Sequence, residues 1–151
     1  MDVEQIRTFV LGLPHVAETM QWGAKLVFWV GDKSIGGKMF AVVNLEEDGR
    51  SVISFCAGQE RFAELLEREG ILPAPYLARA YWVAVERWNV LSAVGWQEEL
   101  TAAHSIVASR LSKKTLGVLA MPVRERKRII TERKGAQPVT KRKRSSGYQK
   151  L

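Results

Sequence analysis

The spacing of apolar residues changes along this chain, and each spacing predicts a different kind of element. Near the start, apolar residues recur every three or four positions from Val3 to Leu13, which predicts a helix with one stripe facing a core. Asp2 is expected to cap this helix, and Pro14 to end it. Between residues 19 and 55 the apolar residues form short runs rich in β-branched and aromatic side chains, which predict an antiparallel meander. Its expected strands are 20–22, 25–30, 39–45 and 51–55, with a hairpin turn at Asp48-Gly49.

Helical spacing returns over residues 62–66. The two prolines of segment 71–76 cannot continue a helix, so this segment interrupts the helical pattern. Residues 81–86 predict one more strand, and the apolar positions between 96 and 111 predict a helix of about four turns that packs on the sheet. An order of helix, several strands, helix, strand and helix predicts an α+β domain, in which helices pack on an antiparallel sheet.

Charge is distributed unevenly along the 151 residues. Residues 1–111 carry 10 Lys+Arg and 14 Asp+Glu, whereas residues 112–151 carry 13 and 2, so the net charge of +7 comes from the C-terminal part. Such segregation predicts a polyanionic partner, such as nucleic acid or an anionic membrane surface. The alternative is a tail that only keeps the protein soluble or helps it dissociate from ribosomal RNA. We predict a folded domain over 1–114 and a basic extension over 115–151, helical over 122–134 and then disordered.

Residues for catalysis or metal binding are few. Cys56 is the single cysteine, and His15 and His104 stand far from it in sequence, so no metal site is expected. The glycine-rich segment 31–39 lacks the spacing of a phosphate-binding loop and has no hydroxyl residue after Lys38, so we predict a flexible hairpin loop there. No apolar run reaches the roughly 20 residues that cross a bilayer, and the start is unlike a signal peptide. We therefore predict a cytoplasmic protein with no enzymatic activity and no cofactor.

Five short motifs occur in the order and approximate spacing seen in a known family. They are Leu13-Pro14, Trp22-Gly23, Gly37-Lys38-Met39-Phe40-Ala41, Pro75-Tyr76-Leu77 and Tyr81-Trp82-Val83-Ala84-Val85. Over residues 1–114 the chain thus resembles the MmcQ/YjbR family of small bacterial proteins. The resemblance implies a compact α+β fold of the YjbR-like "double-wing" type, a role in DNA binding and no enzymatic activity. The chain departs from the family in a longer loop at 31–37, in Ala103-His104 where the family often has Ser-Tyr, and in the basic segment from Arg124 onward.

The positive charge and the resemblance together predict a nucleic-acid-binding protein, with DNA favoured over RNA. Cations that neutralise phosphates release condensed counterions, which favours binding but carries little sequence preference. If Tyr76 and Trp82 lie at the surface beside these cations, bases could stack on them. The alternative is a protein–protein interaction module with an incidental basic tail. The sequence does not indicate the oligomeric state of the protein. The residues predicted to contact phosphates are Lys38, Arg79, Arg124, Arg126, Lys127, Arg128, Arg133, Lys134, Lys141, Arg142, Lys143 and Arg144.

Overall fold

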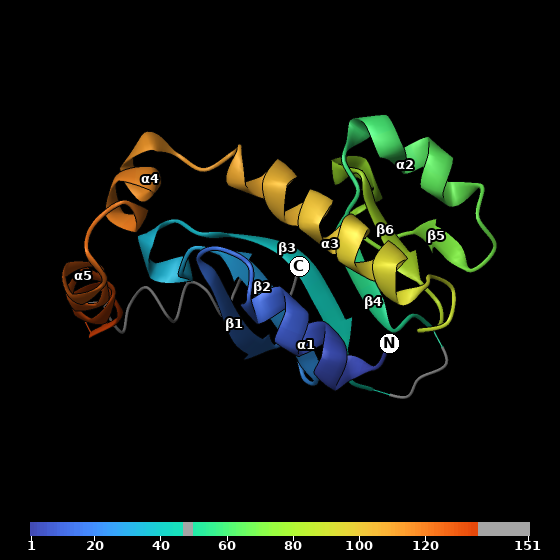
Figure 1. Ribbon diagram of the computed structural model, residues 1–151, viewed down its shortest axis with the longest axis horizontal. Coiled ribbons are helices and arrows are strands. Elements are labelled where there is room, and N and C mark those ends of the chain that lie inside the picture. Colours follow the sequence, from blue (N-terminus) through green and yellow to red (C-terminus); the bar gives the residue numbers. More distant parts are fainter. Residues whose placement is uncertain (47–49, 136–151) are drawn as a thin grey trace.

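A computed structural model of the chain describes residues 1–46 and 50–135. Its centre is a six-stranded sheet with the strand order β1-β2-β3-β4-β6-β5, in which every neighbouring pair is antiparallel. The predicted α+β class is confirmed (Figure 1). The strands are β1 (Val16–Gln21), β2 (Lys25–Val30), β3 (Lys38–Asn44), β4 (Ile53–Cys56), β5 (Ile71–Pro73) and β6 (Trp82–Val85).

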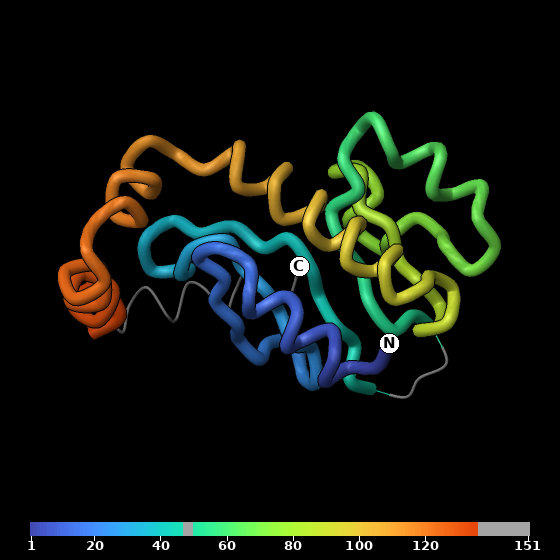
Figure 2. The backbone as a smooth tube through the Cα atoms, viewed as in Figure 1, coloured from blue at the N-terminus to red at the C-terminus, as the bar shows by residue number. Residues whose placement is uncertain are grey.

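The helices of the described residues cover one face of the sheet and both of its ends. They are α1 (Val3–Leu11), α2 (Gln59–Leu66), α3 (Ala93–Ala108), α4 (Lys113–Leu119) and α5 (Val123–Gly135), with two 3-10 turns, η1 (Lys33–Ile35) and η2 (Ala78–Ala80). Helix α3 crosses β2, β3 and β4 beside α1, and α2 packs on β5 and β6. Helices α4 and α5 lie at the end of the molecule opposite α2, and the chain path from α3 through α4 to α5 is plain in Figure 2.

Local hydrogen bonds explain where these helices begin. The Asp2 carboxylate accepts from the Gln5 N–H at 2.9 Å, and the Asp2 N–H donates back to Gln5 Oε1 at 3.0 Å, so the predicted cap is a complete capping box. Ser92 caps α3 and Ser112 caps α4 in the same way, each accepting from a backbone N–H three residues later. The caps satisfy N–H groups that a helix leaves without partners at its first turn.

The core lies between the sheet and α3. Its largest fully buried side chains include Trp96 and Leu100 of α3, and Phe28, Phe40 and Phe55 of the strands that α3 crosses. The apolar runs predicted as strands at 25–30, 39–45, 51–55 and 81–86 correspond to β2, β3, β4 and β6. Burial of apolar side chains therefore determines the position of the four central strands and α3, and the polar and charged side chains lie mainly outside this core.

Two strands differ from the sequence-based prediction. Strand β1 begins at Val16 and ends at Gln21, so Trp22 lies in the β1–β2 turn and not in the predicted strand 20–22. Segment 71–76 contains the unpredicted strand β5, which pairs only with β6 at the edge of the sheet. An edge strand tolerates Pro73 because one side of its backbone forms no ladder hydrogen bonds. The predicted turn at Asp48-Gly49 joins two strands that do pair, but residues 47–49 are outside the described part.

The glycine-rich segment after β2 is a tight turn with its own hydrogen bonds. Asp32 accepts from the Ser34 N–H and hydroxyl, and its carbonyl accepts from the Gly37 N–H at 2.9 Å. A Cβ atom at Gly37 would overlap the carbonyl group of Gly31, so only glycine fits this approach of two backbones. The segment joins the antiparallel strands β2 and β3, so the predicted hairpin loop is present, and within it Lys33–Ile35 form η1.

The sequence pattern does not predict helix α4, which spans residue 114, where the folded domain is expected to end. Thr115, Val118 and Leu119 of α4 are buried, and the latter two belong to the main hydrophobic cluster. The Thr115 hydroxyl donates to the Ile35 carbonyl at 2.7 Å, which ties α4 to η1. The first part of the predicted basic extension thus packs against the sheet domain.

The bond between Thr115 and Ile35 gives a testable contribution to stability. Thr115→Val keeps nearly the same volume but removes the donor, so the Ile35 carbonyl loses its buried partner. We expect the free energy of unfolding to fall by about 1–2 kcal/mol, measured by urea denaturation. Thr101→Val, on the exposed side of α3, is the matched control and should change stability by less than about 0.5 kcal/mol. Equal losses in the two variants would contradict a specific role for this hydrogen bond.

Candidate nucleic-acid interface

Helices α4 and α5 form one end of the molecule (Figure 1). The residues of this end are rich in Lys and Arg. Helix α5 carries six Lys or Arg residues and two Glu residues, and Lys113 and Lys114 are exposed in the first turn of α4. The opposite end is acidic, because Glu60, Glu64 and Glu67 are exposed on α2 and directly after it. The two ends therefore present opposite charge to an approaching polyanion.

Two of the predicted phosphate-binding residues hold α5 in place. Arg126 donates through Nη1 to the carbonyl oxygens of Leu119 and Met121, at 3.2 and 3.1 Å, and so satisfies carbonyls at the end of α4. Lys134 forms an ion pair with Asp32 in which the Nζ to Oδ2 distance is 3.0 Å. Both cations thus have partners within the fold, and their contact with phosphate stays a prediction.

The environment of Asp32 keeps its ion pair charged at neutral pH. Burial disfavours the carboxylate, but hydrogen bonds from Ser34 and Lys134 together with the Lys134 charge outweigh burial, and the pKa of Asp32 lies below its ordinary value. A lowered carboxylate pKa stabilises the folded state at neutral pH, and this stabilisation is lost only as the pH falls through the lowered pKa. The Asp32 carboxylate is therefore ionised at neutral pH, as its ion pair with Lys134 requires.

Arg128 is paired on the surface of its own helix. It contacts Glu132 at 2.9 Å and Glu125 at 3.9 Å, and the three side chains are more than half exposed. Such exposed pairs stabilise by little, so a phosphate could displace the carboxylates. Ile129 and Ile130 are partly buried against the core, which orients the remaining positions of α5 toward solvent.

The other cations of this end have no partner among the residues that the structure describes. Within residues 1–46 and 50–135, no ion pair or side-chain hydrogen bond involves Arg124, Lys127 or Arg133 of α5, or Lys113 and Lys114 of α4. The two α4 lysines are absent from the sequence-based prediction, although Ser112 before them is a typical helix cap that could have revealed the helix. The predicted residues Lys141, Arg142, Lys143 and Arg144 lie outside the described part of the chain. The segment predicted to be disordered begins at Gly135, which belongs to α5, and the rest of that segment is also outside the described part.

The predicted aromatic platform is only half present. Trp82 is 5% exposed in β6, all four residues of which are buried, so its selection as a stacking residue is wrong. Tyr76 is fully exposed, at 103%. The neighbour of Trp82 in sequence, Tyr81, is 36% exposed and packs edge-on against Phe62, with 5.5 Å between ring centroids. The surface aromatic residues on either side of η2 are thus Tyr76 and Tyr81.

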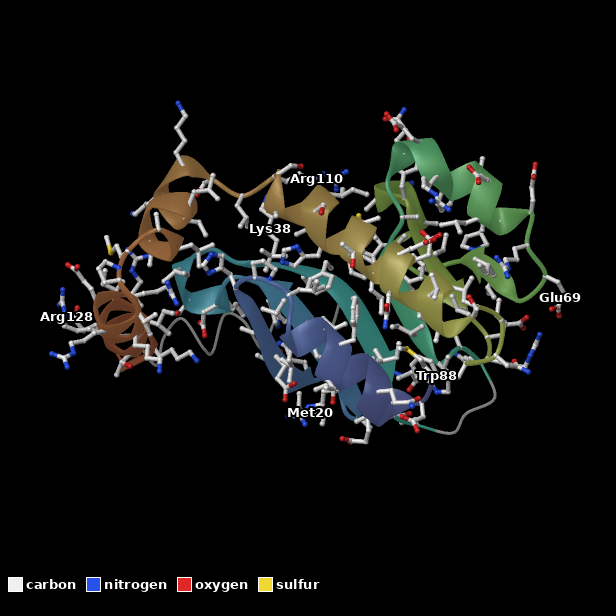
Figure 3. All side chains as sticks on the ribbon, viewed as in Figure 1. Met20, Lys38, Glu69, Trp88, Arg110 and Arg128 are labelled. Carbon is white, nitrogen blue, oxygen red and sulfur yellow. The ribbon has the colours of Figure 1, made fainter. Side chains whose placement is uncertain are left out.

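The ends of strands β3, β4 and β6 on one side of the sheet lie between these tyrosines and the α4–α5 end. Strand β3 begins where β4 ends, which places Lys38 at the same edge as Cys56. Arg110, just after α3, lies with Nη1 3.9 Å from Cys56 Sγ, and Cys56 is paired with Trp82, the residue after Tyr81. Figure 3 shows Arg110 and Lys38 between the α4 end and the α2 end. We call this row of strand ends, with Lys38, Arg79, Tyr81 and Arg110, the strand-end rim.

The titratable side chains with catalytic potential have structural roles. His104 donates from Nε2 to the Pro14 carbonyl, 2.7 Å away, since a carbonyl can only accept, and its ring packs edge-on against Phe40. Burial raises the pKa of the Cys56 thiol, which disfavours a reactive thiolate, and burial lowers the pKa of His15. Among the described residues, no three His, Cys, Asp or Glu side chains are grouped to hold a metal ion. None of the described helices has the length and apolar character needed to cross a bilayer.

Comparisons with known proteins agree on one family. The YjbR family model matches residues 11–106. The crystal structure of the Deinococcus radiodurans protein DR2400, which has a DUF419 domain, is similar with a TM-score of 0.67 and 27% identity, covering 80% of this chain and 88% of that chain. No curated protein matches the sequence. Since the family match spans most of the sheet and the helices that pack on it, the chain belongs to the YjbR family.

Proposed function

We propose that the protein binds nucleic acid without catalysing a reaction, with DNA preferred over RNA. The observation that supports this proposal is a group of cations at the α4–α5 end that have no partner in the described part of the chain, namely Lys113, Lys114, Arg124, Lys127 and Arg133. Like charges held close together repel one another, and a polyphosphate relieves this repulsion. Lys and Arg side chains that no carboxylate neutralises are the groups that contact phosphates.

Phosphate contacts of this kind fix the position of a nucleic acid and carry little sequence information. Recognition of base edges would need a helix that fits the major groove with side chains aimed at the bases. On α5, Arg128 is paired with Glu125 and Glu132, so it does not present a free guanidinium to base edges. The proposed binding is therefore weakly selective for sequence and strongly dependent on salt.

The proposal is tested by substituting the free cations of α5. The variant Arg124→Gln/Lys127→Gln/Arg133→Gln should bind duplex DNA more weakly than the natural protein, and its log-log salt slope should be shallower by about 0.9 for each phosphate that the variant no longer neutralises. Fluorescence anisotropy at several salt concentrations measures affinity and slope together. The fold should persist, because none of these three side chains has an internal partner in the described residues.

A single pair of variants controls for net charge. Lys127→Gln at the basic end and Arg68→Gln near α2 change the charge equally, and each residue is exposed. We expect Lys127→Gln to lower the salt slope by about 0.9 and Arg68→Gln to leave it nearly unchanged. Similar effects of the two variants would mean that overall charge, and not the α4–α5 end, governs binding. An unchanged affinity in the triple variant would refute the proposed interface.

A further inference from the structure

We infer that Tyr76 and Tyr81, with Arg79 between them, form a stacking site for unpaired nucleobases. This inference rests on the proposed function and narrows its substrate class to nucleic acid that has a single-stranded segment. The site lies around η2, where β6 begins, and at this end of the sheet Arg110 contacts Cys56, the strand partner of Trp82. It is distinct from the α4–α5 end, where the proposed phosphate contacts lie.

The first observation is the presentation of Tyr76. Its side chain is fully exposed, and among the described residues it has no hydrogen bond or ring contact. Its φ of 66° lies in the left-handed region, which is rare for a bulky residue. Flanking hydrogen bonds hold it there: the Leu77 N–H donates to the Ala74 carbonyl at 3.2 Å, and the Trp82 N–H donates to the Leu77 carbonyl at 3.3 Å. The backbone thus presents an aromatic ring to solvent without a packing reason.

The second observation is that Tyr81 is a rigid aromatic at the same turn. Its φ is 62°, again left-handed, and it ends η2. The Tyr81 carbonyl accepts from the N–H groups of Ala57 and Gly58 at 2.9 and 3.2 Å, which fastens this residue to the end of β4. Its ring keeps an exposed part while the edge contact with Phe62 fixes the orientation. A ring that is already ordered loses little conformational entropy when a base stacks on it.

The third observation is the charge around the two rings. Arg79 is exposed in η2 and has no ion pair among the described residues, and Arg110 lies beside Cys56, the strand partner of Trp82. An aromatic face for the base and a guanidinium for the adjoining phosphate are the two groups that single-strand binding sites combine. Glu60 is exposed in the first turn of α2 and carries the opposite charge, so we expect the phosphates of a bound strand to lie on the side of Arg79 and Arg110.

This chemistry favours a single strand over a duplex. Bases in a duplex are stacked on each other, so they cannot offer a face to Tyr76 without being extruded. An unpaired base presents its face at no such cost, and stacking tolerates any base because every base has a π-face. We therefore expect the tyrosines to affect binding of single strands and to leave binding of a closed duplex unchanged.

The test uses the full chain and two probes, an oligothymidine of about 20 nucleotides and a DNA duplex of similar length closed by loops of non-nucleosidic linker at both ends. By fluorescence anisotropy, Tyr76→Ala should weaken binding of oligothymidine by about five- to a hundredfold and leave binding of the closed duplex unchanged. Tyr76→Phe retains the ring and should bind oligothymidine like the natural protein. Because Tyr76 is fully exposed, its replacement removes no core packing.

Trp22→Ala is the matched control, since Trp22 is also exposed and left-handed but lies in the β1–β2 turn, away from the rim. It should leave oligothymidine binding unchanged. If Tyr76→Ala binds oligothymidine as tightly as the natural protein, or loses affinity equally for the closed duplex, the stacking site is refuted while the phosphate interface stands. If the natural protein binds neither probe, the proposed function itself fails.

Discussion

Replacing Gly37 with alanine is expected to lower the free energy of unfolding by about 4 kcal/mol or more, a large part of the roughly 5–15 kcal/mol typical of a domain. A Cβ atom there would overlap the carbonyl of Gly31 and lie 2.8 Å from the carbonyl oxygen of Asp32. Both obstacles are backbone, so no side-chain rotation relieves them. The η1 turn would open, and with it the hydrogen bond from Thr115 and the ion pair to Lys134 would break.

Urea denaturation followed by circular dichroism measures this loss, and Gly117→Ala provides the control. Gly117 lies inside α4 with open space where a Cβ would stand, so alanine there should raise the free energy of unfolding by about 0.5–1 kcal/mol. The two substitutions add the same methyl group and are predicted to have opposite signs. A Gly37→Ala protein with an unchanged denaturation midpoint would show that the η1 turn is not constrained in this way.

The elements that can be predicted well from the sequence are those whose own residues carry the core. Strands β2, β3, β4 and β6 are continuous apolar runs, and α3 has an apolar stripe that reaches the sheet. Helix α4 and strand β5 cannot be predicted in this way, because contacts with residues distant in the sequence determine them. Helix α4 is only seven residues long and contains Gly117, and it is stabilised by the bond from Thr115 to Ile35. Strand β5 exists because β6 offers it a partner.

In the candidate site, too, the contacts of some single residues cannot be predicted from the sequence. The sequence reveals that cations accumulate after residue 112, but not that Arg126 caps α4 or that Lys134 pairs with Asp32, because those partners come from other elements. Whether Trp82 or Tyr81 is exposed for stacking depends on the backbone conformation of Tyr81. Tyr81 has a left-handed backbone conformation and ends η2, outside the strand. Trp82 begins β6, which is buried on both faces, so the sequence of β6 shows no alternation of apolar and polar residues that would mark the buried side chains.

Removing residues 112–151 is expected to lower the free energy of unfolding by about 5 kcal/mol, which would leave the remaining domain near its limit of stability. The deletion takes away the buried side chains of Val118 and Leu119, worth about 1.5–3 kcal/mol each, and the donor of the Thr115 hydrogen bond. It also uncovers the η1 turn, on which Leu119 packs at Gly31. Thermal and urea denaturation of the shortened protein measure the loss.

A second deletion, of residues 122–151, separates stability from charge. It retains α4 and removes α5, which is held to the rest of the described chain by the partly buried Ile129 and Ile130, the Arg126 cap and one ion pair. We expect it to remain folded and to lose DNA affinity together with the cations of residues 122–151, which include those of α5 and also Lys141, Arg142, Lys143 and Arg144. The longer deletion is expected to lose affinity also because the domain is destabilised. Equal stability of the two shortened proteins would mean that α4 contributes nothing to the core, and a failure to bind DNA could then be assigned to charge from residue 112 onward.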